Sequence, residues 1–189
     1  TPTDIEYYNG YLFITEAAGD DVDVLEVSDG TNPATISLAG NPRDAEVDSG
    51  DGLLFVGEST NRNLEMHDIS NPESPSLVGS IGDREAQVSA VDPDKNIGAR
   101  AGPDPGGEIG LFTYTTTSIT NESIITAGGN WTGIAIDDDK LVAHDTDNNE
   151  IVFYDISDIS NPTKVETWNA NGDTAYKPDH IGIEGNRVL

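Results

Sequence analysis

Oxygen-bearing side chains alternate along the segment from Asp145 to Glu150, which reads Asp-Thr-Asp-Asn-Asn-Glu. Calcium takes about six to eight oxygen ligands, and alternate spacing lets one tight loop aim several of them inward. Asp145, Asp147 and Asn149 therefore form a candidate calcium site, and calcium is the one cofactor that the sequence suggests. The segment lacks the glycine and the distal glutamate of an EF-hand loop, so a metal-free hairpin turn is the alternative.

A second segment, Asp92-Pro93-Asp94-Lys95-Asn96, has the same alternation and leaves the same two interpretations open. The groups suited to acid–base chemistry near neutral pH are His67, His144 and His180. They occupy non-equivalent places in the repeat described below, so we do not expect them to share a site. The chain has no Gly-x-Ser-x-Gly elbow, Gly-rich phosphate loop or His-Glu-x-x-His motif, and no catalytic residue is predicted.

Two sequons, Asn121-Glu122-Ser123 and Asn130-Trp131-Thr132, match the acceptor sequence for N-glycosylation. Such sequences carry sugars only in surface or secreted proteins, and they also arise by chance. Asn121 and Asn130 are therefore candidate glycosylation sites, and they point to an extracellular or cell-surface location.

An internal repeat determines how these residues are positioned. The segment 22–40 returns at 64–82, and Glu16 returns as Glu58, each 42 residues later. A further copy near the C-terminus places Asp145 at the position of these glutamates. The three acids would end the second strand of their units, either as a cation-gathering ring or as charges that discourage strand pairing.

Four units are expected, at about 3–43, 44–85, 86–130 and 131–176, with the start of a fifth at 177–189. A period of about 40–50 residues is typical of β-propeller blades. Each unit contains short apolar runs with period-two alternation and turn residues between them, which predicts four antiparallel strands and no helix. In the third, most divergent unit, Ile109 and Leu111 replace Leu64 and Met66.

Turn sequences repeat with the strands. Asn9-Gly10 between two apolar runs predicts a tight hairpin. Asp68-Ile69-Ser70-Asn71-Pro72 leads to a corner in which Asp and Ser oxygens bond nearby N–H groups, and Asp155-Ile156-Ser157 repeats it. We expect these Asp and Ser residues to have a structural role.

The Asp-Ile-Ser-Asn-Pro corner, the Pro-Ser-Leu-Val-Gly-Ser strand after it and the Gly-Leu-Leu-Phe-Val hairpin before it resemble the LVIVD repeat. This resemblance covers nearly the whole chain and implies a propeller of the kind found in bacterial and archaeal proteins, many of them on the cell surface. It brings no catalytic set. The incomplete fifth unit leads us to expect either part of a larger propeller or a ring closed by strand exchange with a second copy.

The net charge is −26, from 35 acidic and 9 basic residues, with a pI near 4.1. A negative field of this size disfavours nucleic acid and anionic lipid as partners. The charge is similar to that of haloarchaeal proteins, whose dense carboxylates hold water and ions, and cation binding is the alternative. No cysteine is present and no apolar run reaches about 18 residues, so disulfides and membrane insertion are not expected.

The sequence thus predicts an all-β propeller acting as a non-catalytic extracellular or cell-surface interaction module of a halophile. Its partner would be a protein or a glycan, and self-assembly into a surface structure is a related possibility. The alternative is a propeller hydrolase with a carboxylate-bound metal in the central channel.

Overall fold

The computed structural model describes residues 1–103, 106–169, 181–184 and 187–188. Within these ranges the regular structure is entirely β. No helix long and apolar enough to cross a membrane is found in the described part of the chain.

The strands form four four-stranded sheets and one short pair. The first sheet contains β1 (Pro2–Tyr8), β2 (Tyr11–Glu16), β3 (Asp21–Glu26) and β4 (Ala34–Ser37). The second contains β5 (Pro42–Asp48), β6 (Leu53–Glu58), β7 (Asn63–Asp68) and β8 (Ser76–Ile81). The third contains β9 (Val88–Asp92), β10 (Ile97–Ala101), β11 (Glu108–Thr115) and β12 (Ser118–Thr126). The fourth contains β13 (Trp131–Asp137), β14 (Lys140–Asp145), β15 (Glu150–Asp155) and β16 (Thr163–Asn169), and β17 (Ile183–Glu184) pairs with β18 (Arg187–Val188).

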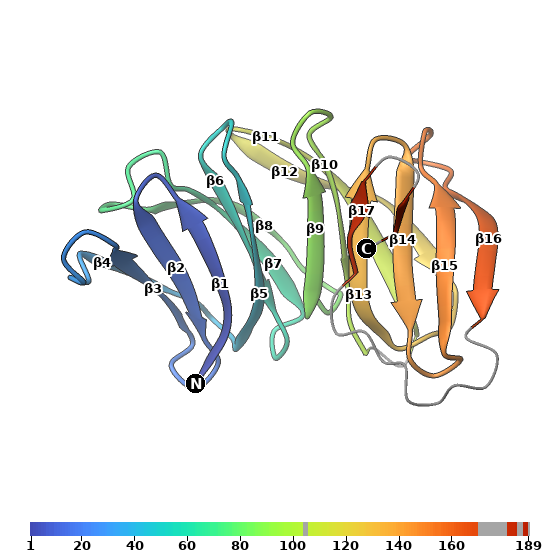
Figure 1. Ribbon diagram of the computed structural model, residues 1–189, viewed down its shortest axis with the longest axis horizontal. Helices are drawn as coiled ribbons and strands as arrows, with labels where there is room; N and C mark the ends of the chain where they lie inside the picture. Colours follow the sequence, from blue (N-terminus) through green and yellow to red (C-terminus); the bar gives the residue numbers. More distant parts are fainter. Residues whose placement is uncertain (104–105, 170–180, 185–186, 189) are drawn as a thin grey trace.

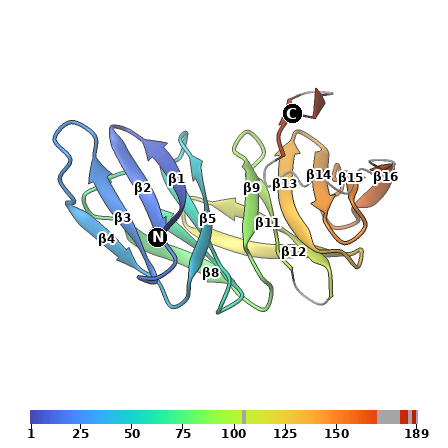
Figure 2. The same cartoon turned by 60° about the horizontal axis from the view of Figure 1, so that its bottom comes forward.

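Each sheet is an antiparallel meander whose strands follow sequence order. The first strands, β1, β5, β9 and β13, contact one another in succession, and we call them the inner strands. Figures 1 and 2 show the sheets arranged side by side around these strands, like consecutive blades. The prediction of an all-β fold built from four-stranded antiparallel blades is confirmed.

The hydrophobic core is divided into layers between successive sheets. Because strand side chains alternate between faces, each central sheet packs against both of its neighbours. Phe13 and Val22 of the first sheet meet Leu54 and Val56 of the second, for example, and all four are fully buried. Such layers make each sheet depend on the next for burial of its apolar face.

The third unit keeps this pattern despite its divergent sequence. Ile109 and Leu111 are fully buried in the layer between the third and fourth sheets. Leu64 and Met66 are fully buried in the preceding layer. The predicted correspondence between these pairs is confirmed.

The predicted turn chemistry is present. Asn9 and Gly10 join β1 to β2 with φ values of 49° and 90°, which a two-residue type I′ hairpin requires at both positions. At the corners, Oδ1 of Asp68 accepts a hydrogen bond from the N–H of Ser70 at 2.9 Å. Oδ1 of Asp155 accepts the matching bond from Ser157 at the same distance. Hydrogen bonding from the side chains of Ser70 and Ser157, together with these backbone bonds, lowers the pKa of both aspartates, as expected for a structural role.

The outward face of the first sheet has no sheet packed against it in the described structure. It carries Ile5, Tyr7, Leu12, Ile14 and Leu25, which we call the open face. Ile5 is 53% exposed and Tyr7 62% exposed. The matching face of the second sheet is buried against the first, with Ala45, Leu54 and Val56 at 1% exposure or less.

The opposite end of the array continues into further chain. β17 lies beside the inner strand β13, and Ile181 and Ile183 pack against Ala135, Val142 and Ile151 of the fourth sheet. Residues 170–176 of the predicted fourth unit and residues 177–180, 185–186 and 189 of the predicted fifth unit lie outside the described residues.

Candidate functional site

Four carboxylates gather on two neighbouring inner strands. Asp4 and Glu6 belong to β1, and Asp44 and Glu46 belong to β5. All four are partly buried, and each pair is separated by one apolar residue, so its members share a face. We call these four residues the inner carboxylate cluster. Sequence reasoning did not single it out.

Two members of the cluster join successive sheets. Oδ2 of Asp4 accepts a hydrogen bond from the backbone N–H of Ala45 at 2.9 Å. Oδ2 of Asp44 accepts bonds from the N–H of Ser89 at 2.6 Å and from its hydroxyl at 2.5 Å. Both aspartates therefore fasten one inner strand to the next.

Burial and mutual repulsion make the cluster hold protons. Burial raises the pKa of Glu46 to about 9, and the charges of Asp44, Glu6 and Asp4 add to the effect. Burial and the charge of Asp4 raise the pKa of Glu6 to about 7. The pKa of Asp44 is also raised to about 7 by burial, although the bonds from Ser89 lower it. The four groups therefore cannot all be ionised at neutral pH.

A small hollow lies beside this cluster. It has a volume of about 80 Å³, and Asp44, Glu46, Ser89, Ile134 and Ile181 line it. Partly protonated carboxylates beside a hollow could exchange protons for a cation. Among the described residues, however, no three His, Cys, Asp or Glu side chains have an arrangement suited to holding a metal ion.

The predicted calcium segment forms the hairpin between β14 and β15. Asp145 is 3% exposed, and its Oδ1 accepts hydrogen bonds from the backbone N–H groups of Asp147, Asn130 and Asn148 at 2.9, 3.1 and 3.4 Å. Its Oδ2 accepts a bond at 2.7 Å from the side chain of Asn148. Asn149 has a φ of 54°. The carboxylate of Asp145 thus organises the turn, and calcium binding by Asp145, Asp147 and Asn149 remains a prediction.

The second segment with alternating oxygens forms the hairpin between β9 and β10 and contacts the fourth sheet. Oδ1 of Asp92 accepts from the N–H of Asp94 at 3.0 Å, and its Oδ2 accepts from the N–H of Asp138 at 2.9 Å. Lys95 forms ion pairs with Asp138 and Asp139. These contacts give the segment a structural role between neighbouring sheets.

Glu16, Glu58 and Asp145 each end the second strand of their sheet, as the repeat predicts. Glu58 is fully buried and accepts a hydrogen bond from Asn63 at 3.0 Å. Burial raises the pKa of Glu58. The expectation of exposed charges that discourage strand pairing is therefore wrong for Glu58 and Asp145, which are buried.

The histidines lie apart. His67 on β7 is 3% exposed and contacts Glu65 at 3.0 Å. His144 on β14 is 1% exposed and contacts the hydroxyl of Thr132 at 3.0 Å. His180 lies outside the described residues. His67 and His144 belong to different sheets and have different partners.

The two sequons differ in accessibility. Asn121 is exposed on the outer strand β12, where its Oδ1 accepts a hydrogen bond from Arg100 at 3.2 Å. Asn130 is partly buried, and its Oδ1 is enclosed without a hydrogen-bond donor. Geometry therefore gives a glycosylation enzyme easier access to Asn121 than to Asn130.

No family model matches the chain, and no curated protein matches it either. Among solved structures, 1025 chains match its fold. One is the crystal structure of a functionally unknown protein from Desulfotomaculum acetoxidans DSM 771, which is 15% identical and superposes with a TM-score of 0.72 over 88% of this chain. The chain spans 57% of the length of that protein. This likeness shows the fold alone.

Proposed function

We propose that the chain consists of LVIVD-type blades of a larger propeller and acts as a non-catalytic interaction scaffold outside the cells of a halophile. The open face is the observation that carries this proposal. Its residues repeat the apolar positions that are buried between the other sheets, and an exposed face of this kind marks an interaction surface. A further blade, from the same polypeptide or from a second copy, would cover it.

The structural roles of the acidic side chains support the proposal that the chain is a scaffold. Asp4 and Asp44 fasten inner strands, Asp68 and Asp155 shape corners, and Asp145 organises a hairpin. In each case a carboxylate accepts bonds from backbone N–H groups. Such a frame leaves the loops free to vary and to contact a protein or a glycan.

The net charge of −26 supports a high-salt habitat and limits the kinds of partner that the protein would bind. Screening by molar salt weakens repulsion among exposed carboxylates. A negative surface would favour a neutral or basic partner over nucleic acid. The same surface would keep the protein soluble in concentrated salt.

Proteolytic shaving of intact cells, followed by mass spectrometry of the released peptides, tests the location. Peptides from this chain should appear before the cells lyse. An abundant cytoplasmic protein serves as the control for lysis. Detection of the peptides only after lysis would refute an extracellular role. The same spectra would show whether Asn121 carries a sugar.

A propeller hydrolase with carboxylate-bound metal is a second candidate, and it rests on the raised pKa values within the inner carboxylate cluster rather than on a ligand arrangement, since no three of the described His, Cys, Asp or Glu side chains are arranged to hold a metal ion. A cation that replaced the protons on Glu6 and Glu46 would stabilise the folded chain. Melting curves with and without calcium at matched ionic strength test this idea. Saturation at submillimolar calcium in the wild type, lost in Glu46→Gln, would support metal binding, whereas dependence on bulk salt alone would exclude it.

A further inference from the structure

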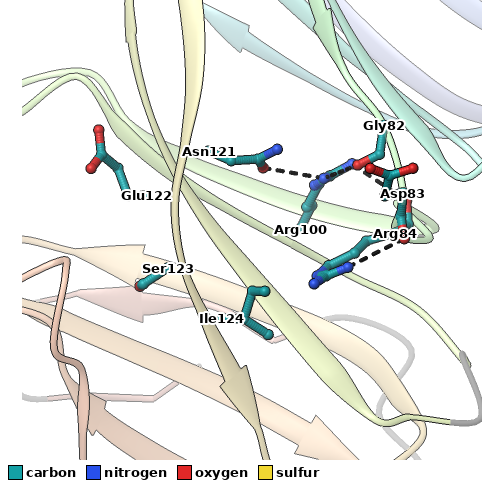
Figure 3. A pocket seen from close by; sticks show the side chains of 8 residues that line it. All are labelled: Gly82, Asp83, Arg84, Arg100, Asn121, Glu122, Ser123 and Ile124. Atoms are coloured by element: carbon teal, nitrogen blue, oxygen red, sulfur yellow. Dashed lines mark hydrogen bonds between the residues drawn. The ribbon is translucent and has the colours of Figure 1, made fainter.

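Basic residues are scarce in this chain, yet three of its five arginines gather at one place. Arg62, Arg84 and Arg100 lie near enough that the first two disfavour the charge on the third. Arg84 and Arg100 stand where the turn after β8 meets the third sheet (Figure 3), and the backbone N–H of Arg84 donates to the carbonyl of Arg62 at 3.1 Å. A concentration of positive charge in a protein with a net charge of −26 calls for a partner of opposite sign.

Arg100 is the buried member of this group. It lies on β10 with 1% exposure, at the ladder position that Val56 and Ala143 occupy in neighbouring sheets. Its guanidinium donates hydrogen bonds to neutral oxygens: the carbonyls of Ile81, Arg84 and Gly82 at 2.7, 3.3 and 2.7 Å, and Oδ1 of Asn121 at 3.2 Å. These bonds use its two terminal nitrogens, whereas its buried Nε has no hydrogen-bond partner in the described structure, and none of the bonds neutralises its charge.

Burial and the neighbouring arginines make that charge costly. Burial, with a smaller contribution from the charge of Arg84 and against an opposing one from Asp83, lowers the pKa of Arg100 to about 10. The side chain therefore remains a cation at neutral pH. A buried cation without full compensation is destabilising, and an anion bound beside it would relieve that cost.

A hollow of about 150 Å³ opens beside these arginines. Gly82, Asp83, Arg84 and Arg100 form one wall, and Asn121, Glu122, Ser123 and Ile124 of β12 form the other (Figure 3). This volume is several times the ~30 Å³ that a water molecule occupies in the liquid. One oxyanion and the first atoms of its carrier would fit.

A β-bulge leaves the nearest acid of β12 away from the hollow's cations. The register between β11 and β12 shifts at Leu111 and Phe112, and Glu122 is the extra residue. Its carboxylate accepts a hydrogen bond from Thr113 at 2.7 Å, on the opposite side of β12 from the arginines (Figure 3). Bulges often re-aim side chains at binding sites.

We propose that this hollow binds a small oxyanion, namely a sulfate, phosphate or carboxylate group. Arg100 supplies a fixed buried charge. Arg84, with 22% of its side chain exposed and its Nε 3.3 Å from Glu108, supplies the adjustable contact. Arginine forks match the oxygens of all three groups. Ser123 and the amide of Asn121 offer further polar contacts at the opposite wall.

Calorimetric titration of the whole chain with sodium sulfate, phosphate or acetate tests the proposal, with chloride holding ionic strength constant. At least one anion should bind saturably, and the ranking of the three identifies the preferred group. Arg84→Gln should weaken that binding at least tenfold. Glu108→Gln removes the same ion pair but keeps the arginine, so it should bind the anion as tightly as the wild type or more tightly.

Two further variants separate a site from general screening. Arg43→Gln removes an exposed arginine elsewhere and should leave binding unchanged. Arg100→Val, which installs the residue found at the same position in the second sheet, should abolish binding if it folds. Absence of saturable binding for all three anions, or equal losses in Arg84→Gln and Arg43→Gln, would overturn the proposal.

Discussion

Replacing Glu46 by glutamine should stabilise the protein at alkaline pH. Because the pKa of Glu46 is raised to about 9 in the folded chain, folding disfavours its ionised form. This penalty is absent below the unfolded pKa, near 4.5, and grows as the pH rises towards 9. A neutral glutamine of the same shape removes the penalty, so the variant should lose less stability than the wild type over this interval.

The structure sets the size of the effect. At about 1.4 kcal/mol per pKa unit, the full shift of Glu46 corresponds to a ceiling of about 6 kcal/mol. Partial exposure, a protein dielectric near ~20 and shared protons within the cluster reduce this to about 1–2 kcal/mol at pH 8. For a chain of this length, that is a rise of about 2–8 °C in melting temperature.

Thermal melts at pH 4.5, 6 and 8, at one ionic strength, measure the effect. Glu166→Gln is the matched control, since Glu166 is exposed on β16 and its replacement removes the same unit of charge. The Glu46 variant should gain stability over this control as the pH rises. If the two variants follow one pH profile, the reasoning about the inner carboxylate cluster is refuted.

Four further substitutions, one of them a control, have expected outcomes. Asp145→Ala should lower the free energy of unfolding in urea by about 2–3 kcal/mol, because several enclosed donors lose their acceptor. The control Asp147→Ala should lower it by under about 0.5 kcal/mol. Equal losses in the two variants would contradict the structural role of Asp145 in the turn. Tyr114→Phe removes the buried 3.1 Å bond from its hydroxyl to Asp48 and should cost about 1–2 kcal/mol in the same assay, an unchanged midpoint being the contrary result. Gly10→Ala, at a φ of 90°, should lower stability by about 1 kcal/mol or more, and a gain would show that the hairpin has another conformation.

The sheets were predictable because their signals are local and repeated. The alternation of apolar residues, Asn9-Gly10 and the Asp68-Ile69-Ser70 corner each act within a few residues, and four copies reinforce the reading. Ile109 and Leu111 could be aligned in the divergent unit because burial on the next sheet preserves apolar character there. Local chemistry and global packing therefore agree at these positions.

The inner carboxylate cluster was missed because loop lengths differ between units. The connection from β5 to β6 is two residues longer than that from β1 to β2, so the inner strands repeat at 40 residues while the rest repeats at 42. Asp4 then corresponds to Asp44, opposite Gly57 as Asp4 is opposite Thr15. The available signal was the shared alternation of acid and apolar residue in both strands.

The burial of individual polar residues was also not predicted from the sequence. Arg100 and Glu58 are charged residue types that are ordinarily exposed, yet both are buried in the folded chain. Arg100 could have been suspected, because it stands at a position that is apolar in Val56 and Ala143. Glu58 offers no such signal, since an acid at a strand end is ordinarily exposed.

Molar mass by light scattering in concentrated potassium chloride tests the central claim, that the open face is a surface meant for another blade. The chain has a mass of 20.0 kDa, and Tyr7, on the edge strand β1, is 62% exposed on that face. We predict that the wild type associates reversibly as its concentration rises and that Tyr7→Asp remains at the monomer mass. A wild type that stays monomeric at every concentration, with the same melting temperature as Tyr7→Asp, would contradict the account.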